Sequence, residues 1–151
     1  MKRMMCLLSV LVIAAFFARP AIADRDEVDD LLERYLAAYN NGDAAALAEL
    51  YSADAVLLPH DQASVRGRSK IEQFWKRTLR FDPARRMGRS VSTLLMAKKA
   101  GADVAYLVGT FGIGSGEIRN FTICLVRDSE GKWRVASEMW NSNGPRFQPA
   151  V

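Results

Sequence analysis

The 151-residue sequence predicts one α+β domain, in which helices come first and an antiparallel sheet follows. In residues 26–82, apolar side chains recur at helical spacing. Residues that cap or end helices flank these stretches. Beyond residue 90, four segments with strand character are joined by short turns. A chain of this length builds one core, so we expect the helices to cover one face of the sheet.

The first 23 residues have the pattern of a cleaved secretory signal peptide. Lys2 and Arg3 form a basic start, residues 7–17 are apolar, and Ala21-Ile22-Ala23 offers the small residues of a cleavage site. A retained membrane anchor is the alternative, but the apolar run is shorter than the ~20 residues that a bilayer requires. We therefore expect export to the periplasm, or secretion, with no stable membrane anchor.

Cleavage changes the charge and the cysteine count of the chain. The full sequence has 21 basic and 17 acidic side chains, and loss of Lys2, Arg3 and Arg19 leaves 18 against 17, a net charge of +1. Such a chain is a poor partner for nucleic acid. Cys6 is lost as well, so Cys124 cannot form an internal disulfide.

The remaining charge is unevenly distributed. Residues 24–65 carry two basic and ten acidic side chains, whereas residues 66–89 carry nine basic and two acidic ones. Solvated faces explain this pattern. A basic rim that attracts anionic ligands is the alternative.

Three helices are expected in the first half. The first is capped by Asp26 and ends at Asn41-Gly42, where glycine adopts the left-handed conformation at little cost. The second is capped by Asp43 and covers residues 44–51. The third opens with the capping box of residues 69–72 and ends at Asp82-Pro83. The stripe of the first helix consists of Val28, Leu31, Leu32, Tyr35, Leu36 and Tyr39.

The sheet begins with a short strand at residues 55–59, followed by a loop. The four main strands are expected at residues 90–98, 103–113, 118–127 and 133–142. The domain therefore spans residues 24–144, and the proline-containing residues 145–151 form an irregular tail.

Three kinds of site are disfavoured by the sequence. The glycines of "GTFGIGSG" (residues 109–116) lie between two strands and predict a hairpin, because a phosphate cradle requires a following helix. His60 and Cys124 lack the companions of a metal site, so no metal is expected. No nucleotide-binding fingerprint is present, and we expect no cofactor.

Aromatic side chains are the more informative residues. A sheet that curves around helices leaves a cone, which these side chains can line. Tyr35 and Tyr39 lie on the helical stripe, where they either fill the core or offer hydroxyl groups to a pocket. The aromatic residues within the other predicted elements are Trp75, Tyr106, Phe111, Phe121 and Trp140.

Three segments resemble the nuclear transport factor 2-like superfamily: "LLERYLAAYNNGDAAALAELYSADAVLLP", "VRGRSKIEQFW" and "GKWRVASEMWNSNGP". More narrowly, they are similar to its secreted ketosteroid-isomerase-like (SnoaL-like) branch of unassigned function. The resemblance covers nearly all of the chain after residue 23. It implies a cone-shaped domain whose curved, mostly antiparallel sheet wraps around three helices from the N-terminal half. Because the superfamily includes isomerases, cyclases, dehydratases and non-enzymatic binding domains, the resemblance does not give a function.

The resemblance to the isomerases places one of their three catalytic groups. Tyr35 falls at the position of the oxyanion-hole tyrosine. The general base is expected just after the first strand, where His60 and Asp61 follow Pro59. The second oxyanion group, a protonated aspartic acid, should fall near Ile123, where this sequence has no acid. Steroid isomerisation is therefore not expected.

The terminal strand offers a replacement carboxylate. If it packs as in the isomerases, Ala136, Glu138 and Trp140 face the cavity, while Val135, Ser137 and Met139 face outward. The alternative is that Glu138 faces solvent from an edge strand. Inside the cavity, Glu138 would accept a hydrogen bond from Tyr35, and we expect burial to raise its pKa against the opposing effect of that bond.

We expect the cavity to bind a small apolar molecule with a polar handle. Glu138 would exchange a proton while Tyr35 donates to a developing oxyanion, which suits isomerisation, dehydration or cyclisation of a carbonyl compound. A non-catalytic ligand-binding or protein-interaction module is the alternative. The expected ligand-binding residues are Tyr39, His60, Trp75, Tyr106, Ile123, Trp140 and Asn141.

A homodimer is expected from the strand at residues 118–127. Phe121, Ile123 and Leu125 alternate with Thr122, Cys124 and Val126, so neither face is strongly polar. One face can cover the cavity, and the other then requires a partner, for which a two-fold dimer is the simplest solution.

The signal-peptide hypothesis predicts that the exported chain begins at Asp24, because Ala21 and Ala23 occupy the positions that the peptidase recognises. N-terminal sequencing of periplasmic material checks this. A first residue of Met1 or Lys2 would contradict it.

Overall fold

The computed structural model describes residues 21–81, 91–112 and 118–142. Helices dominate the first half of the chain and strands the second, which confirms the predicted α+β class. The elements are α1 (Ala21–Asn41), α2 (Ala44–Glu49), β1 (Tyr51–Leu58), β2 (Val65–Arg66), α3 (Arg68–Phe81), β3 (Val91–Lys99), β4 (Val104–Gly112), β5 (Ile118–Arg127) and β6 (Trp133–Ser142). The expected tail at residues 145–151 lies outside the described residues.

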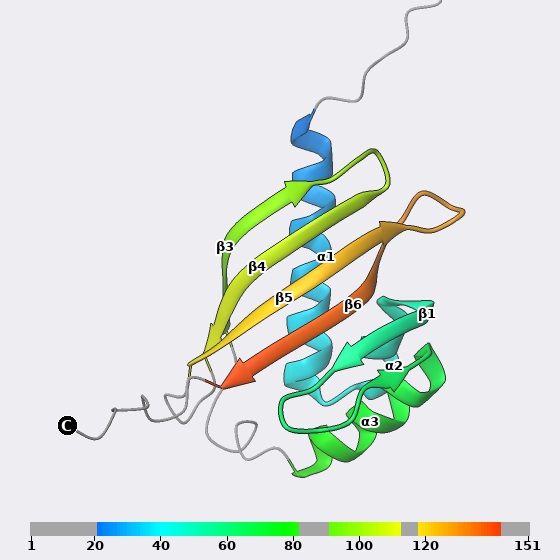
Figure 1. Cartoon of the computed structure of the whole chain (residues 1–151), viewed down its shortest axis with the longest axis vertical. Coiled ribbons are helices and arrows are strands. Elements are labelled where there is room, and N and C mark those ends of the chain that lie inside the picture. Colours follow the sequence, from blue (N-terminus) through cyan, green and yellow to red (C-terminus); the bar gives the residue numbers. More distant parts are fainter. Residues whose placement is uncertain (1–20, 82–90, 113–117, 143–151) are drawn as a thin grey trace, which may run out of the picture.

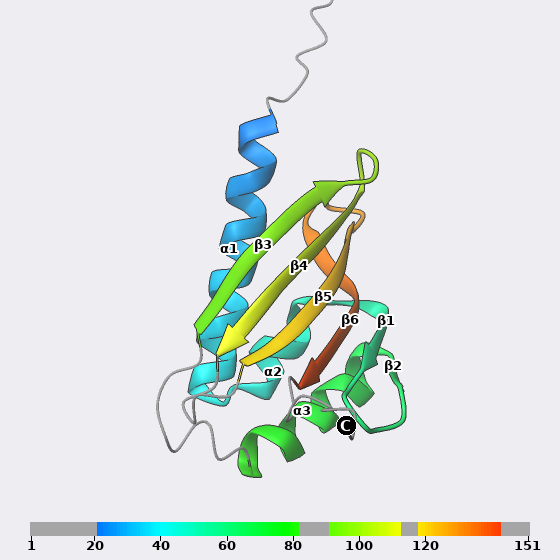
Figure 2. The ribbon, with the colours of Figure 1, turned by 60° about the vertical axis from the view of Figure 1, so that its left-hand side comes forward.

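One six-stranded sheet has the order β2-β1-β6-β5-β4-β3. β1 and β6 are parallel, and every other neighbouring pair is antiparallel. Figures 1 and 2 show α1 along one face of the curved sheet, with α2 and α3 at the end formed by β1 and β2. The predicted curved, mostly antiparallel sheet around three helices is therefore confirmed.

The ends of α1 differ in how well they were predicted. Gly42, at φ 71°, follows the last helical residue and donates its amide to the Tyr39 carbonyl at 3.0 Å, as expected for a glycine that ends a helix. The expected start at Asp26 is wrong, because the helix is already present at Ala21. Alanine and isoleucine continue a helix readily, so the capping residue did not mark its start. No helix in the described ranges is long and apolar enough to cross a membrane.

The segment after α1 contains the largest error of the sequence analysis. Asp43 caps α2 as predicted and accepts from the Ala46 amide at 2.9 Å. However, α2 ends at Glu49 and β1 already begins at Tyr51, whereas a helix to residue 51 and a strand from residue 55 were expected. The Val135 amide of β6 donates to the Leu50 carbonyl at 2.8 Å, so pairing with a distant strand overrides the local helical pattern.

α3 also begins earlier than its capping box suggested. Its first residue is Arg68, so Ser69 lies within the helix and is not its cap. Gly67, at φ 85°, precedes the helix, and its carbonyl accepts from the Lys70 and Ile71 amides. The expected end at Asp82-Pro83 lies outside the described residues.

A bulge in β6 changes which side chains face the helices. Ser137 pairs with Cys124 and Val135 with Leu125, so Ala136 is an extra residue in the ladder. Val135 and Glu138 are therefore both buried, whereas Met139 is 51 % exposed. The expectation that Ala136 faces the interior and Val135 faces outward is wrong, because simple alternation cannot anticipate a bulge.

The core lies between the helices and the inner face of the sheet. On β5, Phe121, Ile123 and Leu125 are buried and Thr122 is exposed, which confirms the predicted alternation of that strand. The largest fully buried side chains are Leu31, Leu47, Tyr51, Leu57, Ile71, Leu107, Leu125 and Val135.

Candidate functional site

Glu138 is the one charged side chain buried among the described residues, and only 5 % of it is exposed. It lies in the middle of β6, in register with Ile123 of β5 and with Leu57 of β1. The alternative that it faces solvent from an edge strand is therefore wrong. A carboxyl group in such a position requires hydrogen-bond donors from the protein.

Two tyrosines supply these donors. The Tyr35 hydroxyl donates to Glu138 Oε1 at 2.8 Å, and the Tyr51 hydroxyl donates to Oε2. Trp75 Nε1 in turn donates to the Tyr51 hydroxyl at 3.2 Å. The expected bond between Tyr35 and Glu138 is thus confirmed. The network joins side chains from α1, β1, α3 and β6, so the tertiary fold as a whole assembles it.

Tyr51 is the residue that the sequence analysis missed. Its ring is fully buried at the start of β1, and its backbone carbonyl accepts from Arg68 Nε at 2.9 Å and from Arg68 Nη2 at 2.7 Å. These bonds fix the backbone at the point where the pairing register between β1 and β6 shifts. Within "ALAELY" the tyrosine continued an apolar helical stripe, and no local signal set it apart.

Aromatic rings surround this carboxyl group. Trp75 and Trp140 stack with ring centroids 5.6 Å apart and planes at 23°. Tyr35 and Tyr39 meet the Trp75 ring edge-on, at 6.4 and 6.0 Å. These arrangements are favourable for aromatic pairs, and they hold in place Tyr35, which donates to Glu138, and Trp75, which donates to Tyr51.

The surroundings explain the acidity of Glu138. Burial raises its pKa to about 7, and the hydrogen bonds from Tyr51 and Tyr35 oppose this rise. The predicted balance, with desolvation stronger than the hydrogen bonds, is confirmed. Burial, followed by the nearby Glu138 charge, raises the pKa of both Tyr35 and Tyr51 well above the usual value, so both remain hydroxyl donors. Near neutral pH, the site therefore contains an exchangeable proton between two fixed donors.

Four of the expected ligand-binding residues are buried in the hydrophobic core: Tyr39, Trp75, Ile123 and Trp140. Their role in binding stays a prediction, as do the catalytic roles of Glu138 and Tyr35.

Three other expected residues lie elsewhere. Tyr106 pairs with Cys124 and lies between the buried Ala105 and Leu107, so it is on the outer face of the sheet. Asn141 is exposed beyond Trp140. His60 lies in the turn after β1, 41 % exposed, with Nε2 3.0 Å from Asp61 Oδ2. Strand alternation separates Tyr106 and Asn141 from the interior, and the turn keeps His60 at the surface.

The described residues contain no group of three or more side chains that could hold a metal ion. The hydrogen-bonded side chains of Glu138, Tyr35, Tyr51 and Trp75 offer one carboxyl group together with hydroxyl and indole donors. This set can bind a carbonyl or hydroxyl group and can move a proton.

Comparison with solved structures places the fold among known ones. A domain of unknown function with a cystatin-like fold from Nostoc punctiforme matches with a TM-score of 0.71 and 13 % identity, over 82 % of this chain and 80 % of that one. A ketosteroid isomerase-like protein from Erwinia carotovora atroseptica matches with a TM-score of 0.64 and 18 % identity, over 80 % and 96 %. An NTF2-like protein of unknown function from Pseudomonas putida matches with a TM-score of 0.64 and 23 % identity, over 87 % and 95 %.

At these identities, the likenesses show the fold alone. No curated protein matches the chain. The model of the SnoaL-like domain matches residues 32–134, which include Tyr35, Tyr51 and Trp75 and end four residues before Glu138. This match covers most of the chain, and the protein therefore belongs to the SnoaL-like domain family.

Proposed function

We propose that this protein is an exported small-molecule-binding protein that uses Glu138 to move a proton on a carbonyl compound. The observation that carries the proposal is the buried carboxyl group, with a pKa raised to about 7, between the hydroxyls of Tyr35 and Tyr51. A general base or acid is most effective when its pKa lies near the working pH. The aromatic surroundings suit an apolar substrate that carries one polar group.

The two tyrosines have different roles in this proposal. Tyr51 is fully buried and receives the Trp75 indole bond, so it holds the carboxyl group in position. Tyr35 is only partly buried, so a substrate approaches from its side. Glu138 takes a proton from the carbon next to the carbonyl, and the Tyr35 hydroxyl turns to donate to the enolate oxygen that forms. Return of the proton to another carbon completes an isomerisation, and loss of a neighbouring hydroxyl as water completes a dehydration.

A non-catalytic ligand-binding module is the second candidate. It is favoured by the fact that both carboxyl oxygens already have partners within the protein. In such a module, the Tyr35 hydroxyl would bind the polar group of the ligand and Glu138 would only hold the tyrosine. Proton exchange on the bound molecule distinguishes the two candidates.

Export and dimerisation are further parts of the proposal. Export rests on the signal-peptide pattern of residues 1–23. Dimerisation rests on the outer face of the sheet, where the strand registers bring several exposed apolar side chains to one side. These side chains are Leu58, Val104, Ile118 and Met139.

The dimer hypothesis predicts twice the monomer mass in light scattering at micromolar concentration. Met139→Glu places a charge on the outer face and should give the monomer mass with an unchanged circular dichroism spectrum. Glu72→Gln on α3, away from that face, serves as the control. A monomeric parent protein would contradict the hypothesis.

The raised pKa of Glu138 predicts a pH-dependent stability. Because the folded state disfavours the charged form, the contribution of Glu138 to stability is greatest below pH 4.5, falls as the pH rises to about 7, and is level above that. The loss is on the order of 3 kcal/mol. Glu138→Gln removes the titration, so the stability difference between the two proteins should change across this range. Urea unfolding at pH 5, 6, 7 and 8 measures it.

The hydrogen bonds give this prediction an internal check. Tyr51→Phe removes a bond that lowers the pKa of Glu138, so the fall in stability should move to higher pH. A constant difference between the parent protein and Glu138→Gln from pH 5 to 8 would show that the carboxyl group has an ordinary pKa, and would remove the basis for a general base.

The reaction class predicts exchange of the α-protons of apolar cyclic ketones in D₂O, measured by proton NMR. Glu138→Gln should abolish protein-dependent exchange, because the amide cannot accept the proton. Tyr35→Phe should slow exchange by ~10²-fold, the scale for loss of one oxyanion donor. Tyr106→Phe, which removes a tyrosine hydroxyl on the outer face, is the matched control and should leave the rate unchanged.

Native mass spectrometry completes the comparison by detecting any co-purified small molecule. A ligand that is retained equally by the parent protein and by Glu138→Gln, without exchange of its protons, would establish the binding module and reject the catalytic role.

A further inference from the structure

The hydrogen bonds on one side of Glu138 form a chain with a fixed direction. The chain begins at Trp75 Nε1, which donates to the Tyr51 hydroxyl oxygen at 3.2 Å. An indole N–H can donate but cannot accept, so this bond occupies an acceptor position of the Tyr51 oxygen. The single proton of the Tyr51 hydroxyl is then directed to Glu138 Oε2. Trp75 therefore sets the direction of the bond between Tyr51 and Glu138.

The bond to the other carboxyl oxygen is not restricted in this way. The Tyr35 hydroxyl donates to Glu138 Oε1 at 2.8 Å, and Tyr35 is only partly buried. A hydroxyl group has one proton to donate and also lone pairs to accept with. Tyr35 can therefore turn to accept a proton that is held on Oε1. The two oxygens of Glu138 thus differ, because Oε2 has a fixed donor and Oε1 has a reversible one.

A proton on Oε2 fits the structure less well than a proton on Oε1. It would have to be donated to the Tyr51 oxygen, which already accepts from Trp75. The Tyr51 hydroxyl would then turn its own proton away from Glu138, although this side chain is fully buried. Its other hydrogen-bond neighbour is Tyr35, which itself donates to Oε1. A proton on Oε1 leaves both bonds of Tyr51 as they are, and the partly exposed Tyr35 reverses instead.

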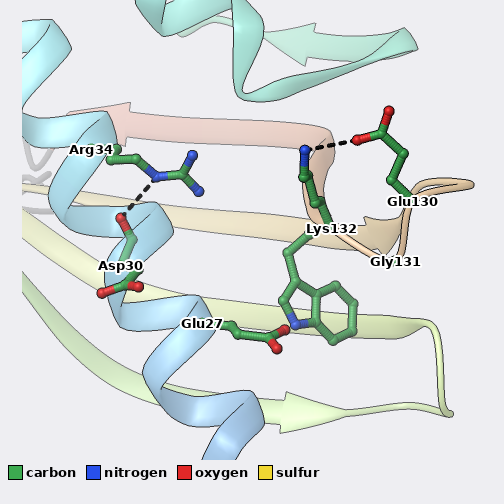
Figure 3. Close-up of a pocket in the computed structure, with 7 residues that line it drawn as sticks. Glu27, Asp30, Arg34, Glu130, Gly131 and Lys132 are labelled. Atoms are coloured by element: carbon green, nitrogen blue, oxygen red, sulfur yellow. Dashed lines mark hydrogen bonds and ion pairs between the residues drawn. The ribbon is translucent and has the colours of Figure 1, made fainter.

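The charged side chains near these residues point elsewhere. Arg34 precedes Tyr35 on α1, but its side chain lies in the pocket between α1 and the turn that joins β5 to β6 (Figure 3). Arg68 donates to the backbone carbonyl of Tyr51. The residues in register with Glu138 on β5 and β1 are apolar. Within the described ranges, the direction of neutral hydrogen bonds therefore decides between the two oxygens.

We propose that Trp75 is a positioning residue, which keeps the exchangeable proton of Glu138 on Oε1. It acts through Tyr51, whose hydroxyl remains a donor to Oε2 in both protonation states. The inference deepens the proposed function and rests on it in one respect: in the proposed reaction, the proton is taken up and returned at Oε1, beside Tyr35. The position of the proton itself can be measured without a substrate.

Infrared difference spectra between pH 5 and pH 9, on either side of the pKa of about 7, test where the proton lies. The C=O stretching band of the protonated carboxyl group appears at the lower pH, and its loss in Glu138→Gln identifies it. A hydrogen bond to a carbonyl oxygen lowers this frequency. With the proton on Oε1, the carbonyl oxygen is Oε2, which accepts from Tyr51. Tyr51→Phe should therefore shift the band upward, and by more than Tyr35→Phe does.

The role of Trp75 is tested by a change that keeps its shape. Site-specific replacement of Trp75 by benzothienylalanine puts sulfur in place of the N–H and retains the ring that stacks on Trp140. Without the donor to Tyr51, the proton can occupy either oxygen, so the single C=O band should become two. The midpoint of the titration should also rise, because Tyr51 becomes a weaker donor to the carboxylate.

The same replacement at Trp140 is the matched control. It alters the same pair of stacked rings but retains the bond from Trp75 to Tyr51, so it should give one band. Circular dichroism checks that each protein is folded. The comparison of Tyr51→Phe with Tyr35→Phe tests the position of the proton even where the altered Trp75 does not allow folding.

Two outcomes would overturn the proposal. A larger band shift in Tyr35→Phe than in Tyr51→Phe would place the proton on Oε2. A single, unshifted band after replacement of Trp75 would show that this residue does not control the position of the proton. The proposed function is judged separately by exchange of the ketone α-protons. The expected bands without exchange would reject proton transfer to a ketone, but would establish the proton on Oε1.

Discussion

The burial of one carboxyl group constrains much of this structure. Charged Glu138 would be strongly destabilising without donors, and the fold brings two hydroxyl groups to it from elements far apart in the sequence. Tyr35 comes from α1, and Tyr51 comes from β1, which lies beside β6. The bulge at Ala136 and the irregular register at the start of β1 are the backbone adjustments that accompany this arrangement.

Arg68 and Trp75 hold Tyr51 in position. The Arg68 guanidinium donates to the backbone carbonyl of Tyr51 and lies 3.6 Å from a Glu49 carboxylate oxygen. The positive charge of Arg68 is therefore paired with Glu49. Trp75 then orients the Tyr51 hydroxyl from α3 and stacks on Trp140 of β6. The same contacts that close the hydrophobic core thus also direct the donors toward Glu138.

The sequence contained half of this site in a form that could be predicted. Tyr35 lies on a helical stripe and Glu138 lies in an alternating strand, so two local periodicities and a family resemblance were enough to pair them. Tyr51 could not be found in this way, because its position depends on β1 pairing with β6, some 80 residues later. The bulge likewise arises from pairing between strands, which local alternation does not encode. The prediction that Tyr106 faces the interior was wrong for a simpler reason. Successive side chains of a strand point to opposite faces of the sheet, so an aromatic residue in a strand can equally well face outward.

The donors to Glu138 are neutral tyrosine hydroxyls, and this is relevant to the role of the carboxyl group. An arginine or lysine beside the carboxyl group would stabilise its charge and lower its pKa far below neutrality. Tyrosine hydroxyls satisfy the same oxygens but leave burial as the stronger effect, so the pKa remains near 7. Arg68 is bonded instead to the backbone of the neighbouring Tyr51 and paired with Glu49. A carboxyl group retained only for stability would gain more from a cationic partner, or from replacement by an apolar side chain. This arrangement is the one that the proposed proton transfer requires, because it leaves Glu138 able to gain and lose a proton near neutral pH.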